Sequence, residues 1–421
     1  MSRKPNHHSK PSRKSNRHSK GPVVPKAAPS QTGRQVPIID DYHVRFEVPK
    51  AAPSQTGRQG GDPRLQRLFP VEPKAPDGQT VQQYKILGMN LSRRALLKAL
   101  AGLAITGGGV GLAAYIIAHE SRPSCGSNGF SWENILTYSN HSNFVFAVAW
   151  SRDNMTIASG GEDHTVQIWD AISGKTQAFF KHPDIVTSVA WSPDEIYVAS
   201  GSDDHKVRIW NTLTNKVVLT YEGHNGPIWG LEWSPDGKYI ASGSLDHTVQ
   251  VWNAINGNHV NTYKGHQASI WGIAWSPDGK SIASSSSDRT VQVWNAINGN
   301  RKLTFGAHTD LVWGVAWSPD GKSIASSSFD CTVKVWQVAN GNIIFSGSHN
   351  DRVYGVSWSL NGQYIASASR DTTIQIWDTD GCNIGSYEGH SEAVYRVVWS
   401  SDNKVLASAS RDDTVQIWSW S

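Results

Sequence analysis

Residues 265–294 read GHQASIWGIAWSPDGKSIASSSSDRTVQVW, and this stretch decides the fold. It holds a His, an apolar run closed by Trp-Ser, a polar turn, Ile-Ala-Ser, an Asp and an alternating run that ends in Trp. The same parts return in the same order seven times. The closing Trp recurs every 41 or 42 residues, at Trp169, Trp210, Trp252, Trp294, Trp336, Trp377 and Trp418. Such self-similarity is typical of repeat architectures, in which neighbouring units bury each other's apolar faces.

Within a unit the apolar residues recur with a period of two. Residues 290–294, Thr-Val-Gln-Val-Trp, alternate between polar and apolar side chains, and residues 269–275 form a partly buried run. The turn at 276–279, Ser-Pro-Asp-Gly, separates such runs, because Pro presets the turn and Gly accepts a positive φ. Each unit is therefore expected to form about four short antiparallel strands, and one such sheet must stack on its neighbours to bury both faces.

These residues resemble the WD40 repeat family over about 134–421. The resemblance implies an all-β fold, a seven-bladed β-propeller, with a hydrogen-bonded His, Ser, Asp and Trp network in each blade. The matching sets are His141, Ser159, Asp163, Trp169; His182, Ser200, Asp204, Trp210; His224, Ser242, Asp246, Trp252; His266, Ser284, Asp288, Trp294; His308, Ser326, Asp330, Trp336; His349, Ser367, Asp371, Trp377; and His390, Ser408, Asp412, Trp418. Ser, His and Asp also make catalytic triads, but seven copies indicate a structural role.

The last unit lacks a fourth strand of its own, because the sequence ends three residues after Trp418. Residues 134–141, Asn-Ile-Leu-Thr-Tyr-Ser-Asn-His, match the segments that precede the repeat His elsewhere, such as 217–224. We therefore predict that 134–140 completes the seventh blade and leaves no open sheet edge. The propeller domain is then 134–421.

The N-terminal residues differ in composition from the repeats. Residues 1–98 hold 19 Lys/Arg and 6 Asp/Glu, whereas the remainder holds 20 and 29, so a basic tail (+13) precedes an acidic body (−9). Residues 24–35 and 48–59 are the same twelve, VPKAAPSQTGRQ. Repetitive sequence that is rich in Pro, Ser and Gln predicts a disordered tail over 1–91. The tail is expected to be a spacer, and lipid or nucleic acid are its alternative ligands.

Residues 99–118 are twenty uncharged, mostly apolar residues, enough for a helix to span a bilayer. The segment before them, Ser-Arg-Arg-Ala-Leu-Leu-Lys at 92–98, resembles the bacterial twin-arginine export signal, with Arg93 and Arg94 as its targeting pair. The alternative is an ordinary transmembrane helix with positive flanks. Both interpretations place the tail in the cytosol and the propeller on the other side of the membrane. The reason is that positively charged segments next to a membrane span remain on its cytosolic side. Residues 92–118 are thus predicted to be a targeting or anchoring segment, and residues 119–133 a stalk. The sequence leaves open whether the apolar segment is cleaved off or retained as an anchor.

No cofactor, metal or catalytic activity is expected. The sequence contains no G-x-S-x-G, H-E-x-x-H or C-x-x-C motif, and the cysteines at 125, 331 and 382 lack metal or redox spacing. We therefore predict that the chain is not an enzyme.

A binding surface is predicted at the mouth of the central channel. In propellers of this kind the residue one step into each inner strand faces the mouth, and here those positions hold Phe146, Thr187, Trp229, Trp271, Trp313, Tyr354 and Tyr395. Aromatic residues dominate binding hot spots. The positions before each network Asp should lie near the same rim: Glu162, Asp203, Leu245, Ser287, Phe329, Arg370 and Arg411. The alternative is that the aromatic rings only fill the channel mouth.

The sequence thus predicts a non-enzymatic scaffold that binds a protein or peptide. The scaffold is expected to be either tethered to a membrane or exported across it. A propeller enzyme, a carbohydrate-binding module and a cytosolic regulatory scaffold are the alternatives. The expected location is the bacterial cytoplasmic membrane with the propeller outside, or export; the cytoplasm is the alternative. Nucleic acid is not the expected partner, and no oligomeric state is predicted.

Overall fold

The computed structural model of the 421-residue chain describes residues 84–86, 89–91 and 132–420. The chain divides into two units, residues 1–96 and 97–421. In the first unit, β1 (Tyr84–Ile86) pairs antiparallel with β2 (Met89–Leu91), so the tail predicted to be disordered includes a short hairpin. Arg93, Arg94, the apolar segment 99–118 and most of the stalk lie outside the described residues. Within those residues no helix is long and apolar enough to cross a bilayer.

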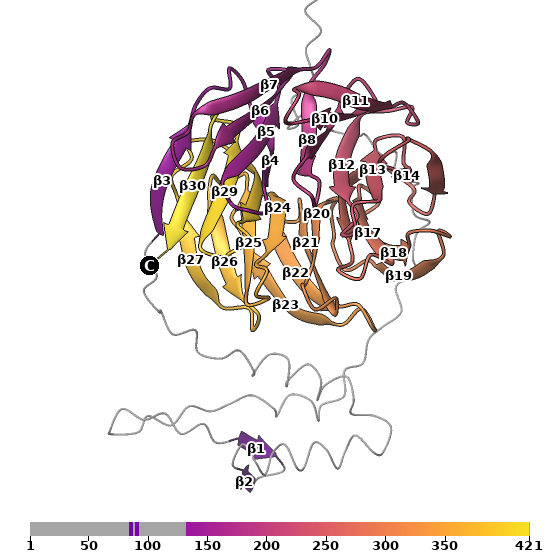
Figure 1. Cartoon of the computed structure of the whole chain (residues 1–421). Coiled ribbons are helices and arrows are strands. Elements are labelled where there is room, and N and C mark those ends of the chain that lie inside the picture. Colours follow the sequence, from indigo (N-terminus) through magenta and orange to yellow (C-terminus); the bar gives the residue numbers. More distant parts are fainter. Residues whose placement is uncertain (1–83, 87–88, 92–131, 421) are drawn as a thin grey trace, which may run out of the picture. The chain divides into compact units, whose positions relative to one another are not determined.

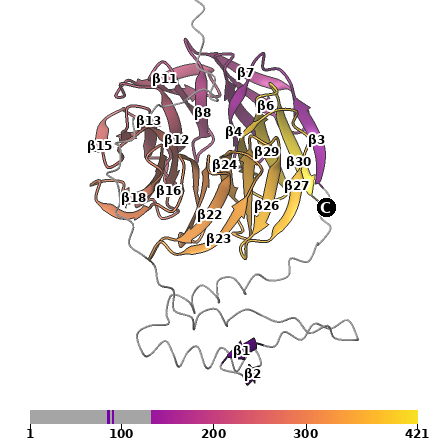
Figure 2. The ribbon, with the colours of Figure 1, turned by 180° about the vertical axis from the view of Figure 1, so that it is seen from behind.

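The described part of the second unit, residues 132–420, forms seven four-stranded antiparallel sheets arranged as blades around one axis (Figures 1 and 2). Blade 1 comprises β4 (Val145–Trp150), β5 (Thr156–Gly161), β6 (Thr165–Asp170) and β7 (Thr176–Lys181). Blade 2 comprises β8 (Val186–Trp191), β9 (Tyr197–Ser202), β10 (Val207–Asn211) and β11 (Lys216–Tyr221). Blade 3 comprises β12 (Ile228–Trp233), β13 (Tyr239–Ser244), β14 (Val249–Asn253) and β15 (His259–Tyr263).

The remaining blades repeat this order. Blade 4 comprises β16 (Ile270–Trp275), β17 (Ser281–Ser286), β18 (Val291–Asn295) and β19 (Arg301–Phe305). Blade 5 comprises β20 (Val312–Trp317), β21 (Ser323–Ser328), β22 (Thr332–Gln337) and β23 (Ile343–Ser348). Blade 6 comprises β24 (Val353–Trp358), β25 (Tyr364–Ser369), β26 (Ile374–Asp378) and β27 (Asn383–Tyr387). Blade 7 comprises β28 (Val394–Trp399), β29 (Val405–Ser410), β30 (Val415–Trp420) and β3 (Trp132–Tyr138). The predicted seven-bladed, all-β propeller is confirmed.

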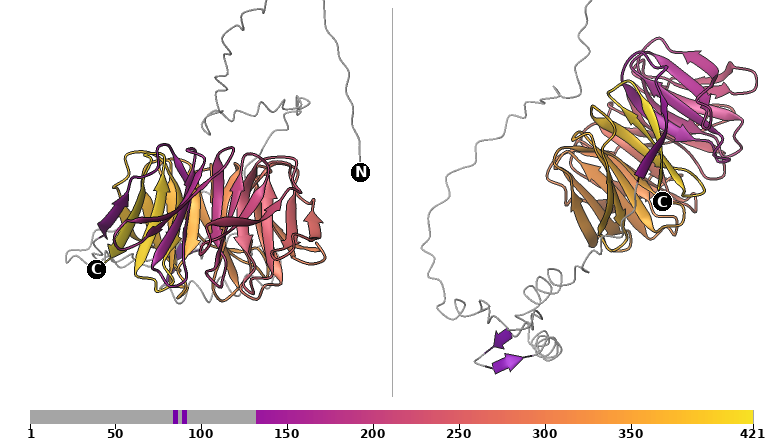
Figure 3. Two further views of the ribbon diagram at one scale, coloured as in Figure 1. Left: turned by 45° about the horizontal axis from the view of Figure 1, so that its top comes forward. Right: turned by 90° about the vertical axis from the view of Figure 1, so that its left-hand side faces the viewer.

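The inner strands form the wall of the channel. Each lies against the inner strand of the next blade, and β28 lies against β4, which closes the circle. Figure 3 shows the first strands of the propeller, in purple, beside the last strands, in yellow. These strands approach one another closely. A Cβ added at Gly314 would come within 2.7 Å of the Tyr354 carbonyl oxygen of the neighbouring inner strand, so only glycine fits there.

The apolar core lies between the blades. One cluster, for example, joins Val249, Val251 and Tyr263 of blade 3 to Ile270 and Trp294 of blade 4, all buried. Burial of a large apolar side chain contributes about 1.5–3 kcal/mol. Because every such cluster needs two blades, no blade can bury its apolar face alone.

The seventh blade takes its outer strand from the other end of the propeller sequence. Strand β3 pairs antiparallel with β30 from Trp132↔Trp420 to Tyr138↔Val415, and the Trp132 and Trp420 rings stack at 5.8 Å. The strand begins two residues before the predicted segment 134–140 and ends two residues before its end. This pairing covers the free edge of β30 with backbone hydrogen bonds.

Deletion of residues 131–140 should lower the melting temperature of the full chain by about 10 °C or more, because β30 would lose its partner strand and blade 7 part of its core. Thermal unfolding followed by far-ultraviolet circular dichroism measures this change. Ile135→Ser is the matched control, since this side chain in β3 is 52% exposed. An unchanged melting temperature in the deletion variant would show that β3 does not close the ring.

Candidate functional site

The four residues of the repeat network meet inside six of the seven blades. In blade 4, Asp288 Oδ2 lies 2.8 Å from His266 Nδ1, and His266 Nε2 lies 2.8 Å from Ser284 Oγ. The indole N–H of Trp294 donates to the same Ser284 hydroxyl oxygen at 3.1 Å. Over all seven blades the Trp–Ser distances are 2.7–3.3 Å. The structure thus brings these predicted residues together.

The direction of these hydrogen bonds follows from the donors present. An ionised Asp288 can only accept, so His266 donates from Nδ1, and Nε2 of the neutral ring accepts from the Ser284 hydroxyl. Ser284 has no exposed surface, and its oxygen accepts from Trp294. A hydroxyl that is enclosed in this way has no access to a substrate, so the arrangement links strands rather than presenting a nucleophile.

The network carboxylates are held in their charged form. Burial alone would raise the pKa of Asp288, but hydrogen bonds from His266, from Thr290 and from the Gln267 backbone lower it to about 2. Burial opposes the same lowering at Asp412, whose pKa is also about 2 because of His390 and Thr414. These aspartates therefore favour the fold most when ionised.

Blade 2 departs from the predicted network. The Arg208 guanidinium lies between the two expected partners, 2.6 Å from Asp204 Oδ2 and 3.2 Å from His182 Nδ1. Burial and the Arg208 charge lower the pKa of His182 to about 3. The direct His182–Asp204 contact predicted from the sequence is thus replaced by an arginine bridge. At the position of Arg208 five of the other blades carry Gln, which is shorter and uncharged.

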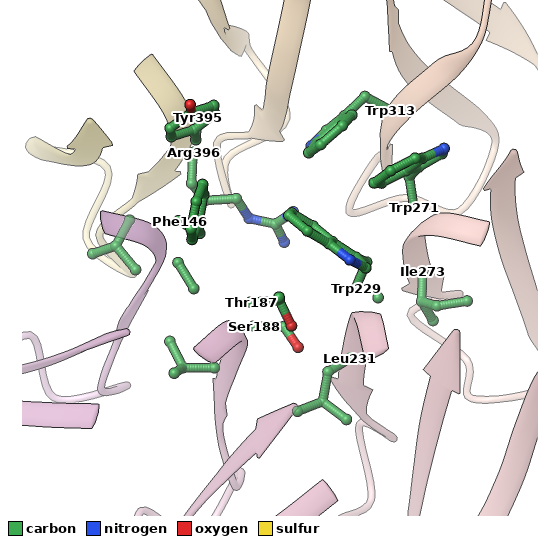
Figure 4. A pocket seen from close by; sticks show the side chains of 14 residues that line it. Phe146, Thr187, Ser188, Trp229, Leu231, Trp271, Ile273, Trp313, Tyr395 and Arg396 are labelled. Atoms are coloured by element: carbon green, nitrogen blue, oxygen red, sulfur yellow. The ribbon is translucent and has the colours of Figure 1, made fainter. Parts of the chain in front are cut away.

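The aromatic side chains at the channel mouth pack on one another (Figure 4). The Trp271 and Trp313 rings stack at 4.3 Å, and Trp229 meets both edge-on at 5.2 and 5.3 Å. Phe146 contacts Tyr395 at 4.9 Å, and Tyr354 contacts Tyr395 at 5.0 Å.

This packing favours the alternative, in which the aromatic rings fill the channel mouth, over an aromatic surface offered to a partner. Of the six predicted aromatic contacts, five are at most 8% exposed: Phe146, Trp271, Trp313, Tyr354 and Tyr395. Only Trp229 is partly exposed. The physical reason is convergence, because inner strands from seven blades bring these rings onto one axis, where they exclude water by stacking.

The seven predicted rim residues are all partly exposed and lie at the turns between the second and third strands: Glu162, Asp203, Leu245, Ser287, Phe329, Arg370 and Arg411. Acidic residues lie on blades 1 and 2 and basic ones on blades 6 and 7. On blade 5, Phe329 stacks on Trp313 at 5.6 Å, and the Arg352 guanidinium lies 4.7 Å from the Phe329 ring. The rim is therefore divided in charge, with an aromatic residue beside its basic half.

The two acidic rim residues differ in environment. Burial raises the pKa of Glu162, and the nearby positive charge of Arg411 opposes this. Burial, together with the negative charges of Asp184 and Asp204, raises the pKa of Asp203 to about 7. Arg411 also lies 4.9 Å from the Phe144 ring, so the acidic and basic parts of the rim meet between blades 1 and 7.

Two charged residues inside the channel were missed from the sequence. The residue after each mouth position is Ala, Ser or Gly in six blades but Arg396 in blade 7. In blade 3 Glu232 extends to blade 4, where its Oε2 accepts from the Trp275 backbone N–H at 2.6 Å. Burial raises the pKa of Glu232 to about 7 against the opposing charge of Arg396, and burial lowers that of Arg396. Aligning the seven units would have revealed both residues as departures from the repeat.

The part of the chain that the structure describes contains no group of three or more His, Cys, Asp or Glu side chains placed to hold a metal. Cys331 is a free thiol, whereas Cys382 is disulfide-bonded.

Comparison with known proteins gives two family models and one relative. Residues 174–386, about half of the chain, match the model "IFT122 first beta-propeller". Residues 132–170 and 381–419 match "WD domain, G-beta repeat"; the first segment precedes the other match and the second overlaps its end. A 68-residue stretch is 32% identical to "Protein HIRA" of Zea mays. The aligned stretch covers 14% of this chain and 7% of that protein. The chain thus spans only a small part of this relative.

The variant Asp288→Asn should lower the free energy of unfolding at neutral pH by about 1–3 kcal/mol, because it removes a charged acceptor from a buried network. The folded-state pKa of Asp288 lies below its ordinary value. Its contribution is therefore complete above about pH 4 and is lost as the pH falls toward about 2. The stability difference between the two proteins should shrink over that range. Urea unfolding at several pH values measures it, with the exposed Asp380→Asn as control; a constant difference would contradict the assignment.

Proposed function

This chain belongs to the family of WD40-repeat β-propellers, and we propose that it is a non-enzymatic scaffold that binds a protein or peptide over the mouth of its channel. The observation that carries the proposal is the divided rim. Its acidic side includes Glu162 and Asp203, although Asp203 is only partly ionised at neutral pH because its pKa is about 7, and its basic side includes Arg370 and Arg411. Complementary charges favour the correct orientation and speed of encounter with a partner.

Phe329 and Trp229 supply the apolar part of this surface. Both are partly exposed and rest on buried rings, so their orientation is fixed before a partner arrives. Preorganised aromatic residues bind with little loss of side-chain entropy. The deeper rings act by supporting these two. A carbohydrate-binding module is less well supported, because most of the rings that a sugar would stack upon are buried.

We also propose that the propeller lies outside a membrane, through anchoring by residues 99–118 or export under Arg93 and Arg94. Cys382 supports this proposal, since disulfides persist mainly in oxidising compartments. The sequence holds three cysteines, and Cys331 is free, so within one chain Cys125 is the remaining candidate to pair with Cys382.

The binding proposal predicts that Phe329→Ala lowers recovery of a cross-linked partner from native cells by about tenfold, because truncation removes a central aromatic contact. Quantitative mass spectrometry of material recovered with the full chain measures this loss. Leu213→Ala is the control, since Leu213 is 81% exposed on the opposite face, at a turn between third and fourth strands. Equal recovery with Phe329→Ala and the wild-type chain would exclude the rim as the contact surface.

The location proposal predicts that the propeller is cut by protease added to intact cells. Denatured full-length protein from those cells should show one reactive thiol before reduction and three afterwards, because Cys125 and Cys382 would be paired. Thiol labelling followed by mass measurement gives both counts. Protection from protease together with three reactive thiols before reduction would place the propeller in a reducing compartment instead.

A further inference from the structure

The channel below the aromatic rings contains an unusual set of hydrogen-bond donors. Figure 4 shows the side chain of Arg396 extending from blade 7 between Phe146 and Trp229. Arg396, Ser188 and Trp229 line the same cavity. Among residues 132–420, no partner accepts a hydrogen bond from the Arg396 guanidinium, and its one attractive charge partner is Glu232.

Two neutral donors in this cavity also lack partners. The Ser188 hydroxyl and the Trp229 indole N–H are both buried, and neither makes a hydrogen bond to a described residue. Thr187, beside them, differs, because its hydroxyl is bonded to the carbonyl oxygens of Gly201 and Ile228. A buried donor without an acceptor costs about 1–3 kcal/mol. Two such donors and a cation at one cavity indicate a site that is completed by an acceptor.

The chemistry of the donors identifies the acceptor. The set offers a positive charge and N–H and O–H donors, but a water molecule can accept only two hydrogen bonds. A carboxylate offers two oxygens with about four acceptor positions, and a guanidinium matches its geometry with two parallel hydrogen bonds. The cavity is small, about 30 Å³, which favours a small planar anion such as a carboxylate over a bulkier one such as phosphate or sulfate.

We propose that the channel binds a carboxylate group, with Arg396 as the charged donor and Ser188 and Trp229 as the neutral donors. The proposal rests on the proposed function in one respect: the carboxylate would belong to an acidic side chain or chain terminus of a bound partner. Trp229, the partly exposed ring of the mouth, lies where such a group would enter. A free small carboxylate has the same chemistry and is the other source.

Glu232 is the principal competitor for Arg396. Its carboxyl interacts with Arg396 through charge, yet its Oε2 is occupied by the Trp275 backbone N–H, and no ion pair joins the two side chains among the described residues. Glu232 therefore weakens anion binding when it is ionised without filling the donor set. Glu232→Gln keeps the acceptor oxygen for Trp275 and removes the charge.

The test is titration of the purified full chain with ¹³C-formate, followed by line broadening in nuclear magnetic resonance. We expect saturable binding to the wild-type chain, a loss of at least about tenfold in Arg396→Met and of about threefold in Ser188→Ala, and stronger binding in Glu232→Gln. Arg352→Met, which changes the arginine beside Phe329, is the matched control and should bind formate like the wild type.

Absence of saturable formate binding to the wild-type chain would overturn the proposal. Wild-type affinity for formate in both Arg396→Met and Ser188→Ala would overturn it as well. The conservative Ser188→Ala keeps the test decisive if Arg396→Met unfolds.

Two further ligands, N-acetyl-aspartate amide and N-acetylglycine, then distinguish the possible sources of the carboxylate. Binding of either supports a partner's side chain or terminus, respectively, whereas binding of formate alone supports a free anion. If cross-linking of a partner to the rim persists in Arg396→Met, the carboxylate site fails while the proposed function stands.

Discussion

In every blade one buried serine hydroxyl joins the tryptophan of the third strand to the histidine of the loop that enters the blade. In blade 4 this hydroxyl is Ser284 Oγ, within 3.1 Å of Trp294 Nε1 and 2.8 Å of His266 Nε2. The rest of the propeller depends on this interaction, because it fixes the entering loop against the sheet. That loop in turn sets where the inner strand begins. Since buried polar groups are costly when unpaired, all members of the network must form together.

The repeat and its departures have different roles. The residues that recur in every blade hold sheets together and line up the inner strands. The residues that differ between blades lie at the mouth and in the channel: the divided rim, the partly exposed Trp229, and the charged Arg396 and Glu232. The positions that differ between blades make the surface of the propeller asymmetric. Only these positions can distinguish one orientation of a bound partner from another.

The sequence predicted the number of blades because the spacing of Trp and His is a local signal that seven copies reinforce. It also identified the network members. It could not predict that Arg208 would lie between His182 and Asp204, since this depends on the length of one side chain in a folded blade. The burial of Trp271 and Trp313 was predicted only as the alternative, because the space at the axis is a property of all seven blades together. Arg396 could have been found, because it replaces a small residue of the repeat.

The central claim is that a partner contacts the mouth of the channel. Site-specific photo-cross-linking in native cells tests it most directly, with a photoreactive amino acid at Leu245 on the rim or at Ile255 on the opposite face of the same blade. Ile255 is 84% exposed, so a photoreactive side chain at this position is at least as accessible to a partner as one at Leu245. We expect a cross-linked protein from Leu245 and none from Ile255. Cross-linking from Ile255 alone would contradict it.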